Sequence, residues 1–585
     1  MIDTYADIAA IHERGIDRLT DEAVALYESD RARFDTWFAE ACQSNNMPRT
    51  LAGGLVLRAH DAFSGPQREW FAEALLAAGR YDDALEMLER VLAEDRVNPD
   101  ALSGLATALA GLGRVREAAD AARRLGKHGR RNKIRARRDA SLAIIEEVEP
   151  RLSESPSLRD WRAYLEACVA LGAGPAGQEA ATRLQSTPGL FDHGYGEDGL
   201  AVLNALIALG AAEGAAPIIR RIRRRRPGDQ HLLAAEIQCE IQKGRPSAGR
   251  VLASAVSEAS SPLVRAASAH ATIEAGRDVE GIRELARLAS EAGKYHGVTA
   301  PLAKAIGAHV LSTHDTRFRQ VQGRPRVFNL MPFSNELTLL KLRMAEMADW
   351  VDHFVLVEAA RTFTGLEKPL QFEAAKAEFA EFLPKILHVR VPEFPDYLAG
   401  AWARDYYQRD MAVTALAGLW GPDDVVILTD ADEIIRPSAL EAFEGELMGL
   451  TTTNHKFFFN YTAVQPGGLL MRRSSTICRA RVLREFGSSY IRFYLTWFRK
   501  DWNAIPDAGW HFSFMNTARL IARKFESYAH SEALEAGWSN DAKVAGVLAD
   551  VRSGRFEDGW QRQDLDDSFP AYVRQNREAL AEFIL

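Results

Sequence analysis

A pattern that recurs every 34 residues constrains the fold of this 585-residue chain more than any other feature of its sequence. The matched positions are Ala74, Gly79, Arg80 and Ala84 in one unit and Ala108, Gly113, Arg114 and Ala118 in the next. Up to about residue 310, apolar residues also recur at i, i+3, i+4 and i+7, the spacing of helices with one buried face. Units this short bury that face only against their neighbours, so the pattern predicts a stack of helix pairs.

The unit at residues 72–100 resembles the tetratricopeptide repeat. In that repeat a glycine lets two antiparallel helices approach closely, a small alanine lies where they cross, and a proline ends the second helix. Gly79 and Pro99 fit these positions, and weaker copies of the unit lie at Gly172, Gly210, Gly244 and Gly276. Residues 1–315 are therefore predicted to form a tetratricopeptide-like α-solenoid whose concave face binds a protein partner.

Two arginine-rich segments interrupt the repeats, at residues 123–138 and 220–226. Each has two interpretations. A run of basic residues is commonly the solvated face of a helix, and it can also be a docking patch for an acidic partner or for a carbohydrate-phosphate chain. The sequence alone leaves both open.

Net charge and cysteine spacing exclude several classes of protein. A net charge of -8 and a pI near 6.0 argue against a globally basic nucleic-acid-binding protein. The four cysteines form no C-x-x-C pair, which argues against a zinc site or a disulfide framework. The first residues lack the pattern of a signal peptide, and no apolar run approaches the ~18 residues of a transmembrane segment. We therefore expect a cytoplasmic protein.

Beyond about residue 320 the pattern changes to short apolar runs that alternate with helical segments. The predicted strands are residues 326–333, 353–358, 385–391 and 424–428. The predicted helices between them are residues 336–347, 371–382 and 402–419. This alternation predicts a mostly parallel sheet with right-handed crossovers and a ligand site beyond the carboxyl ends of its strands.

Two carboxylates follow the fourth predicted strand, in the run Leu-Thr-Asp-Ala-Asp-Glu that ends at Glu433. Asp430 and Asp432 form a DxD motif, which can hold a divalent cation that neutralises a diphosphate. The same pattern is common in turns, but its position at the ligand edge of a parallel sheet favours the functional interpretation. Glu433 assists these two residues or pairs with Arg436.

Four blocks in the second half resemble glycosyltransferase family 17, the family of the β-1,4-N-acetylglucosaminyltransferases that add the bisecting residue to N-glycans. The blocks begin FSNELTLL at 333–369, WARDYYQRD at 402–410, LTDADEIIRP at 428–437 and AGWHFSFMN at 508–532. The resemblance covers about residues 326–535. It implies a GT-A fold for residues 320–585, which end in a helical tail. It also implies Mn²⁺ or Mg²⁺, UDP-N-acetylglucosamine as the expected donor, and inversion at the anomeric carbon.

The resemblance also places the site residues. The expected metal ligands are Asp430 and Asp432, with His511 and His530 as candidates for a third ligand or, alternatively, as structural histidines. The residues expected at the donor are Asn335, Glu336, Glu358, Arg361, Thr364, Lys368, Arg409, Asp430 and Trp510. For several of them a structural role is the rival interpretation: a helix cap for Asn335 and Glu336, a carboxylate pair for Arg409, and a core position for Trp510.

Inversion requires a base that takes the proton from the acceptor hydroxyl. Asp507 and Glu526 are the two candidates, and the position of Asp507 just before the Gly-Trp-His turn slightly favours it.

The leading hypothesis is thus a metal-dependent inverting glycosyltransferase whose protein or glycan acceptor is recruited by the helical repeats. Animal members of the family carry a membrane anchor, which this sequence does not show, so we do not expect bisection of N-glycans. Two alternatives stay open: a scaffold with an inactive transferase half, and a nucleotidyl or phosphoryl transferase that uses the same carboxylates.

Overall fold

The computed structural model describes residues 2–43, 46–125, 133–171, 173–192, 195–254, 256–258, 260–292, 296–319, 323–466, 468–495, 504–527 and 538–585. The chain divides into two compact units, Met1–Gly281 and Ile282–Leu585. Among the described residues, no helix combines the length and the apolar composition needed to cross a membrane.

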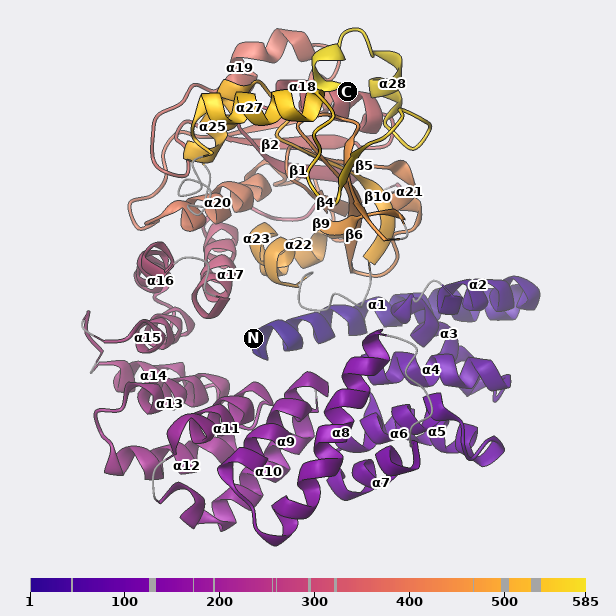
Figure 1. The fold of residues 1–585 in the computed structure, drawn as a ribbon, viewed down its shortest axis with the longest axis vertical. Coiled ribbons are helices and arrows are strands. Elements are labelled where there is room, and N and C mark those ends of the chain that lie inside the picture. The colour runs from indigo at the N-terminus through magenta and orange to yellow at the C-terminus, as the bar shows by residue number, and fades with distance from the viewer. Residues whose placement is uncertain are drawn as a thin grey trace. The chain divides into compact units, whose positions relative to one another are not determined.

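The first unit is a series of helices in which each packs against the next along the chain (Figure 1). They are α1 Ile2–Ser29, α2 Arg31–Gln43, α3 Met47–Ala59, α4 Gly65–Ala77, α5 Tyr81–Glu94, α6 Pro99–Gly111, α7 Val115–Leu125, α8 Lys133–Glu154, α9 Leu158–Leu171, α10 Gly174–Ser186, α11 Gly196–Ala208, α12 Ala212–Arg225, α13 Gln230–Gln242, α14 Pro246–Ala253 and α15 Pro262–Glu274. The predicted helical repeats are confirmed.

The repeat glycines lie where one helix ends and the next begins. Their backbones are left-handed at each described position, with φ of 74° at Gly79, 76° at Gly113, 74° at Gly210, 67° at Gly244 and 81° at Gly276. Gly172 lies outside the described residues. The glycines that recur every 34 residues in the sequence are therefore the residues at the turns where helices end.

The arginine-rich segment at residues 220–226 belongs mostly to α12. Arg223 pairs with Glu236 at 2.6 Å and Arg225 with Asp192 at 2.6 Å, so part of this charge is matched within the unit. The other segment, residues 123–138, lies largely outside the residues whose side chains are described.

The second unit contains a mixed sheet. Its strands are β1 Val327–Phe333, β2 His353–Ala359, β3 Ile386–Val391, β4 Val425–Leu428, β5 Glu433–Ile435, β6 Leu447–Lys456, β7 Tyr461–Gln465, β8 Gly468–Leu469, β9 Met471–Arg479, β10 Ala504–Ser513 and β11 Trp560–Arg562. The main path through the sheet is β11-β7-β6-β9-β4-β1-β2-β3. The four predicted strands are β1 to β4, and they pair in parallel as expected.

The second unit also contains helices, the first of which begins in the last residues of the first unit. They are α16 Asp278–Ala292, α17 His296–Thr313, α18 Leu337–Met347, α19 Gln371–Ala375, α20 Ala401–Asp410, α21 Pro437–Glu441, α22 Ala480–Phe486, α23 Ser488–Tyr490, α25 Ala518–Ser527, α27 Asp541–Arg552 and α28 Ala571–Gln575. Helix α17 packs on α20, α22 and α23. It therefore belongs to the second unit and not to the first.

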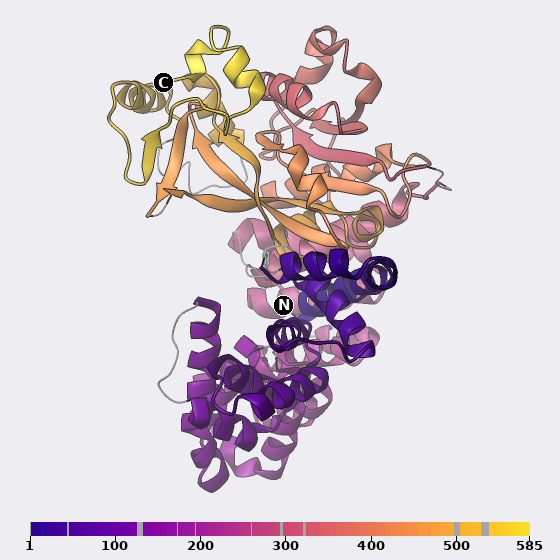
Figure 2. The same ribbon diagram turned by 90° about the vertical axis from the view of Figure 1, so that its right-hand side faces the viewer.

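The sequence pattern did not anticipate the second half of the sheet. β9 pairs antiparallel with β4 and with β6, and β10 runs parallel to β6 while pairing antiparallel with β5. The long strands β6, β9 and β10 are strongly twisted, as the orange ribbons of Figure 2 show. The tail, expected to be helical, also contributes a strand, because β11 pairs antiparallel with β7.

Candidate active site

The DxD motif lies at the carboxyl end of β4, as the sequence predicts, but its two aspartates have different surroundings. Both oxygens of Asp430 accept from guanidinium groups: Oδ1 from Arg409 at 2.5 Å and Oδ2 from Arg492 at 2.8 Å. Burial alone would raise the pKa of Asp430, but the two arginines outweigh it and hold that pKa well below its usual range. Asp430 is therefore a fixed carboxylate between two cations.

Asp432 is itself buried, at 8 % exposure, and belongs to a second group, which we call the Asp432 centre: Glu336, Asp432, His511 and Lys524. Lys524 Nζ lies 3.4 Å from Asp432 Oδ2 and 3.3 Å from Glu336 Oε1. His511 Nε2 is 3.6 Å from Asp432 Oδ1. The centre thus joins three segments: the start of α18, the end of β4, and the late β10–α25 block.

The backbone brings these segments together through β10. His511 is the register partner of Glu433, and the Phe512 amide donates to the Asp432 carbonyl at 2.8 Å. At the other end, Glu336 Oε2 accepts from the amides of Ser334 and Asn335. Glu336 therefore both closes the turn after β1 and presents its second oxygen to Lys524.

Glu433 is buried and does not pair with Arg436. Its carboxylate accepts from Arg492 at 2.8 Å, from Ser475 Oγ at 2.8 Å and from the Asp430 amide at 2.7 Å. Glu433 thereby fixes the start of the motif from inside the sheet.

Arg343 is a site residue that the sequence analysis missed. Its side chain, on α18, is fully buried, and Nη2 donates to the carbonyls of Asp430, Ala431 and Glu433 at 2.7, 3.2 and 2.6 Å. Nη1 donates to Asn329 Oδ1 at 2.5 Å. Burial lowers the pKa of Arg343 to about 10, so it remains charged at neutral pH. The sequence signal that could have pointed to Arg343 is an arginine among the mostly apolar residues of α18.

Arg409 and Arg492 hold the motif from two further elements. Arg409, on α20, also donates to Asp405 at 2.9 Å, and this is the carboxylate pairing that rivalled a phosphate contact. Arg492 lies in a π-helical turn, Ile491–Leu495, and Nη1 donates to the Leu428 carbonyl at 3.1 Å. The sequence analysis did not single out Arg492.

Glu358 is the next-to-last residue of β2, which ends at Ala359 and so runs one residue beyond the predicted end, and its carboxylate is buried and hydrogen-bonded. Oε1 accepts from the amides of Gln371 and Phe372, and Oε2 lies 3.0 Å from His388 Nε2. In this structure Glu358 caps α19 and ties β2 to β3.

The polar loop after β2 forms part of a cavity of about 400 Å³. Its lining residues are Ala360, Arg361, Glu367, Lys368, Pro369, Pro392 and Glu393. Lys368 Nζ is buried and has no hydrogen-bond partner among the described residues. Burial lowers the pKa of Lys368, against the opposing charges of Glu358 and Glu336. Thr364 is exposed and contacts Thr362 at 2.9 Å.

Trp510 directly precedes His511 in β10, so their side chains point to opposite faces of the strand, and Asp507 lies three residues before Trp510. Trp510 is 6 % exposed, donates to the Ser568 carbonyl, and is covered by Arg436 at 4.2 Å from the ring centroid, so it presents no open face to a sugar. Asp507 pairs with Arg436 at 3.2 Å. It precedes His511 by four residues, in the part of β10 where the register is irregular and Asp507 itself has a φ of 47°.

The other two predicted residues are not placed. The side chain of Glu526, near the end of α25, lies outside what the structure describes, and so does His530. Both remain predictions.

The side chains of the site supply only some of the ligands that a divalent cation needs. Among the described residues, no three His, Cys, Asp or Glu side chains gather as a metal site. Asp432 and His511 supply one oxygen and one nitrogen donor near each other, whereas both oxygens of Asp430 are taken. Mg²⁺ and Mn²⁺ are commonly held by one or two protein ligands, with water and substrate phosphate completing the shell. Asp432 and His511 fit that pattern.

Fold and site together define a class. A parallel half-sheet with polar residues beyond the carboxyl ends of β1, β2 and β4 is the architecture of α/β domains that bind a ligand at this edge. Residues 302–549 match the model of glycosyltransferase family 17, and residues 75–138 match a tetratricopeptide repeat model. Both matches agree with the resemblances that the sequence shows.

Curated relatives agree with the first match. The chain is 28 % identical over 273 residues to β-1,4-mannosyl-glycoprotein 4-β-N-acetylglucosaminyltransferase of Rattus norvegicus and 27 % identical to that of Homo sapiens. Each match covers 41 % of this chain and 49 % or 50 % of the relative, so the chain spans about half the length of these relatives. Among solved structures, a tetratricopeptide repeat protein from Parabacteroides merdae is 9 % identical, with a TM-score of 0.21, over 49 % of this chain and 97 % of its own.

Proposed function

We propose that the second unit is a glycosyltransferase that moves a sugar from a nucleotide-sugar donor to a hydroxyl group of an acceptor. The observation that carries the proposal is the Asp432 centre, which lies at the ligand edge of the sheet inside the region that matches family 17. The names of the curated relatives support N-acetylglucosamine as the sugar, and UDP-N-acetylglucosamine as the donor to test first.

In this proposal the donor diphosphate lies at the Asp432 centre. Lys524 contributes positive charge there, and Glu336 and Asp432 hold its ammonium group in place. The cavity lined in part by Arg361, Lys368 and Glu393 receives the nucleoside end of the donor. Asp430 does not bind the donor but keeps the motif in shape between Arg409 and Arg492.

A divalent cation is proposed at Asp432 and His511, where, once bound, it would stabilise the leaving diphosphate as a Lewis acid. The acceptor oxygen forms a bond to the anomeric carbon while the bond from that carbon to the diphosphate oxygen breaks, which inverts the configuration. The acceptor proton passes to a carboxylate, for which Asp507 and Glu526 remain the candidates.

The helical repeats of the first unit are proposed to recruit the acceptor. Stacked helix pairs present an extended surface, and such surfaces commonly bind proteins. The acceptor is accordingly a protein, or a glycan carried by one.

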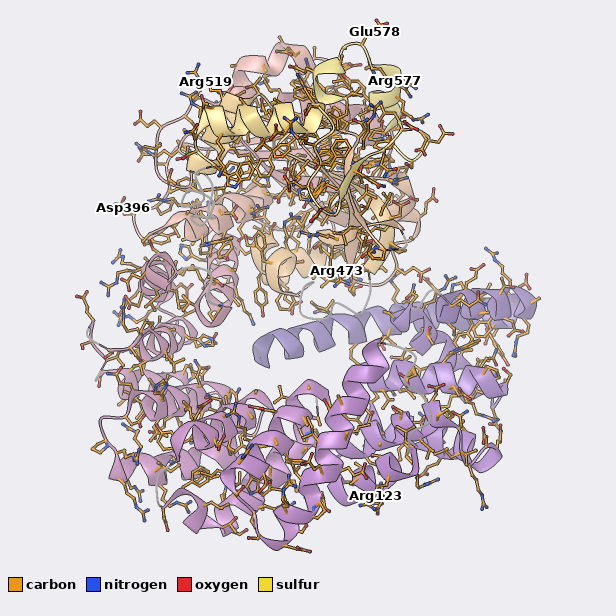
Figure 3. All side chains as sticks on the ribbon, in the orientation of Figure 1. Arg123, Asp396, Arg473, Arg519, Arg577 and Glu578 are labelled. Atoms are coloured by element: carbon orange, nitrogen blue, oxygen red, sulfur yellow. The ribbon has the colours of Figure 1, made fainter. Side chains whose placement is uncertain are left out.

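The test is turnover by the full chain with Mn²⁺ and a panel of UDP-, GDP- and CMP-sugars. We expect release of a nucleoside diphosphate from one donor and a loss of about 100-fold or more in Asp432→Asn, because the donor centre loses its carboxylate. Asp396→Asn is the matched control, since Asp396 projects from an exposed loop (Figure 3) and should leave turnover unchanged. Release of pyrophosphate instead would identify a nucleotidyl transferase, and equal rates in both variants would refute the assigned site.

A further inference from the structure

Two adjacent residues at the end of α20 act on the acidic motif by different routes. Arg409 reaches Asp430 directly. Asp410 points elsewhere, into the contact between α17, α20 and α23, and it has no part in the mechanism above.

Asp410 is almost completely buried, at 1 % exposure, and its two oxygens are treated differently. Oδ1 accepts from the amides of Ser488 and Ser489 at 2.5 and 3.3 Å. Oδ2 is buried without a hydrogen-bond partner among the described residues. Burying a carboxylate that has hydrogen bonds to only one of its oxygens costs free energy. The two amide hydrogen bonds to Oδ1 offset part of that cost.

The packing around Asp410 leaves little freedom. A Cβ atom added to Gly487 would lie 2.9 Å from Asp410 Oδ1 and 2.8 Å from the Cα of Gly307. A second bond fixes the same junction, because Ser489 Oγ donates to the Tyr406 carbonyl of α20 at 3.0 Å. The start of α23 is therefore held against α20 at two points.

The segment held in this way leads directly to Arg492. Helix α23 ends at Tyr490, and the π-helical turn that follows carries Arg492, whose guanidinium reaches Leu428, Asp430 and Glu433. A shift of α23 would move this guanidinium from the motif.

We propose that Asp410 is a positioning residue: by anchoring the amides of Ser488 and Ser489 it sets Arg492, and through Arg492 it sets the motif that presents Asp432. The inference rests on the proposed function for its activity readout. It assigns α20 control over both guanidinium groups on Asp430, one through Arg409 and one through Asp410.

The experiment is a double-mutant cycle on the full chain, with Asp410→Ala, Arg492→Lys and the double variant. A misplacement of the order of 1 Å can cost up to about 100-fold in rate, so we expect each single variant to lose about 10- to 100-fold in turnover. If Asp410 acts through Arg492, the double variant is no slower than Arg492→Lys alone. Losses that multiply would overturn the proposal.

Asp424→Asn is the matched control. Asp424 is also a buried aspartate that accepts two backbone amides, from Arg326 at 2.8 Å and Gly421 at 2.7 Å, but it lies at the other end of β4. It should lower Tm while turnover stays near that of the wild type. The variant matched to it is Asp410→Asn, and equal loss of turnover in Asp424→Asn and Asp410→Asn would reduce Asp410 to a general structural role and overturn the proposal.

A thermal-melting cycle keeps the inference testable if the proposed function fails. Should the wild type release no nucleoside diphosphate from any donor, the proposed function is refuted, and the Tm values of the same four proteins then decide. We expect the Tm losses of Asp410→Ala and Arg492→Lys to be non-additive, because both break one junction. Additive losses would overturn the link between the two residues.

Discussion

Three arginines from three elements, two of them buried, fix the five residues that follow β4. Arg343 binds their carbonyl groups, while Arg409 and Arg492 bind the carboxylate of Asp430. Each cation faces groups of opposite charge or polarity, which is the condition for burying a guanidinium without a large net cost. The loop that presents Asp432 is therefore rigid before any ligand arrives.

The first prediction concerns Arg343. Arg343→Met should lower the free energy of unfolding by about 3 kcal/mol, because it leaves buried carbonyl groups without donors and removes a charge that Glu433 and its neighbours face. Chemical denaturation of the full chain measures this loss. The control is Arg519→Met, since Arg519 is exposed (Figure 3) and should change stability by less than about 0.5 kcal/mol. Similar losses in the two variants would contradict this role.

The second prediction concerns the pH dependence of stability. Burial raises the pKa of Asp410 from 3.8 to about 7, against the opposing charge of Arg409 on the same helix. The groups that contact it from α17 and α23, Gly307, Gly487 and the amide of Ser488, carry no charge. The folded protein thus binds this proton more tightly than the unfolded chain does.

The sign follows from that difference. The contribution of Asp410 is fully present below pH 4 and is lost as the pH rises toward 7, by an amount on the order of 4 kcal/mol. Asp410→Asn removes this dependence, so its stability relative to the wild type should be greater at pH 8 than at pH 5. Denaturation midpoints of both proteins at the two pH values test this, and a constant difference would contradict it.

Sequence alone located some site residues and not others, for a physical reason. Asp430 and Asp432 follow a strand, and local order is enough to place them at the sheet edge. Arg343 and Arg492 act on backbone and carboxylate groups that are 59 to 90 residues away in the sequence, so no local pattern reports their partners. The same holds for Trp510. A tryptophan in the sequence could stack on a sugar, and only the structure shows that Arg436 covers its ring.

At the scale of elements, the repeats were predictable because their signal is local. The repeat glycines that the structure describes all have a left-handed backbone, which other residues adopt at a cost. The antiparallel strands of the second unit were harder, because β9 and β10 pair with strands that lie far away in the chain and β10 has an irregular register between Ile505 and Gly509.

The third prediction tests the repeat turns. At Gly210, φ is 74° and a Cβ would meet no atom within 4 Å, so only the backbone conformation resists substitution. Gly210→Ala should therefore cost about 1 kcal/mol of stability. Gly228→Ala is the control, because that glycine is equally open and is not in the left-handed region. Melting temperatures of both variants check this, and equal values would contradict it.

At the scale of the whole molecule, the chain joins a helical-repeat unit to a region that matches the family 17 model, within 585 residues. The first unit offers stacked helices for binding, and the second concentrates charged groups at one sheet edge. This division predicts that donor chemistry depends on the second unit, while the choice of acceptor depends on the first.

The most direct test of the account is calorimetric titration of UDP-N-acetylglucosamine, with Mn²⁺ present, into the full-length wild type, Asp432→Asn and Asp396→Asn. The account predicts binding to the wild type and to Asp396→Asn, and a loss of at least about tenfold in affinity in Asp432→Asn, because the donor diphosphate loses its carboxylate-held cation. Equal affinity in all three proteins, or binding of no nucleotide sugar by the wild type, would contradict the assignment of the Asp432 centre as the donor site.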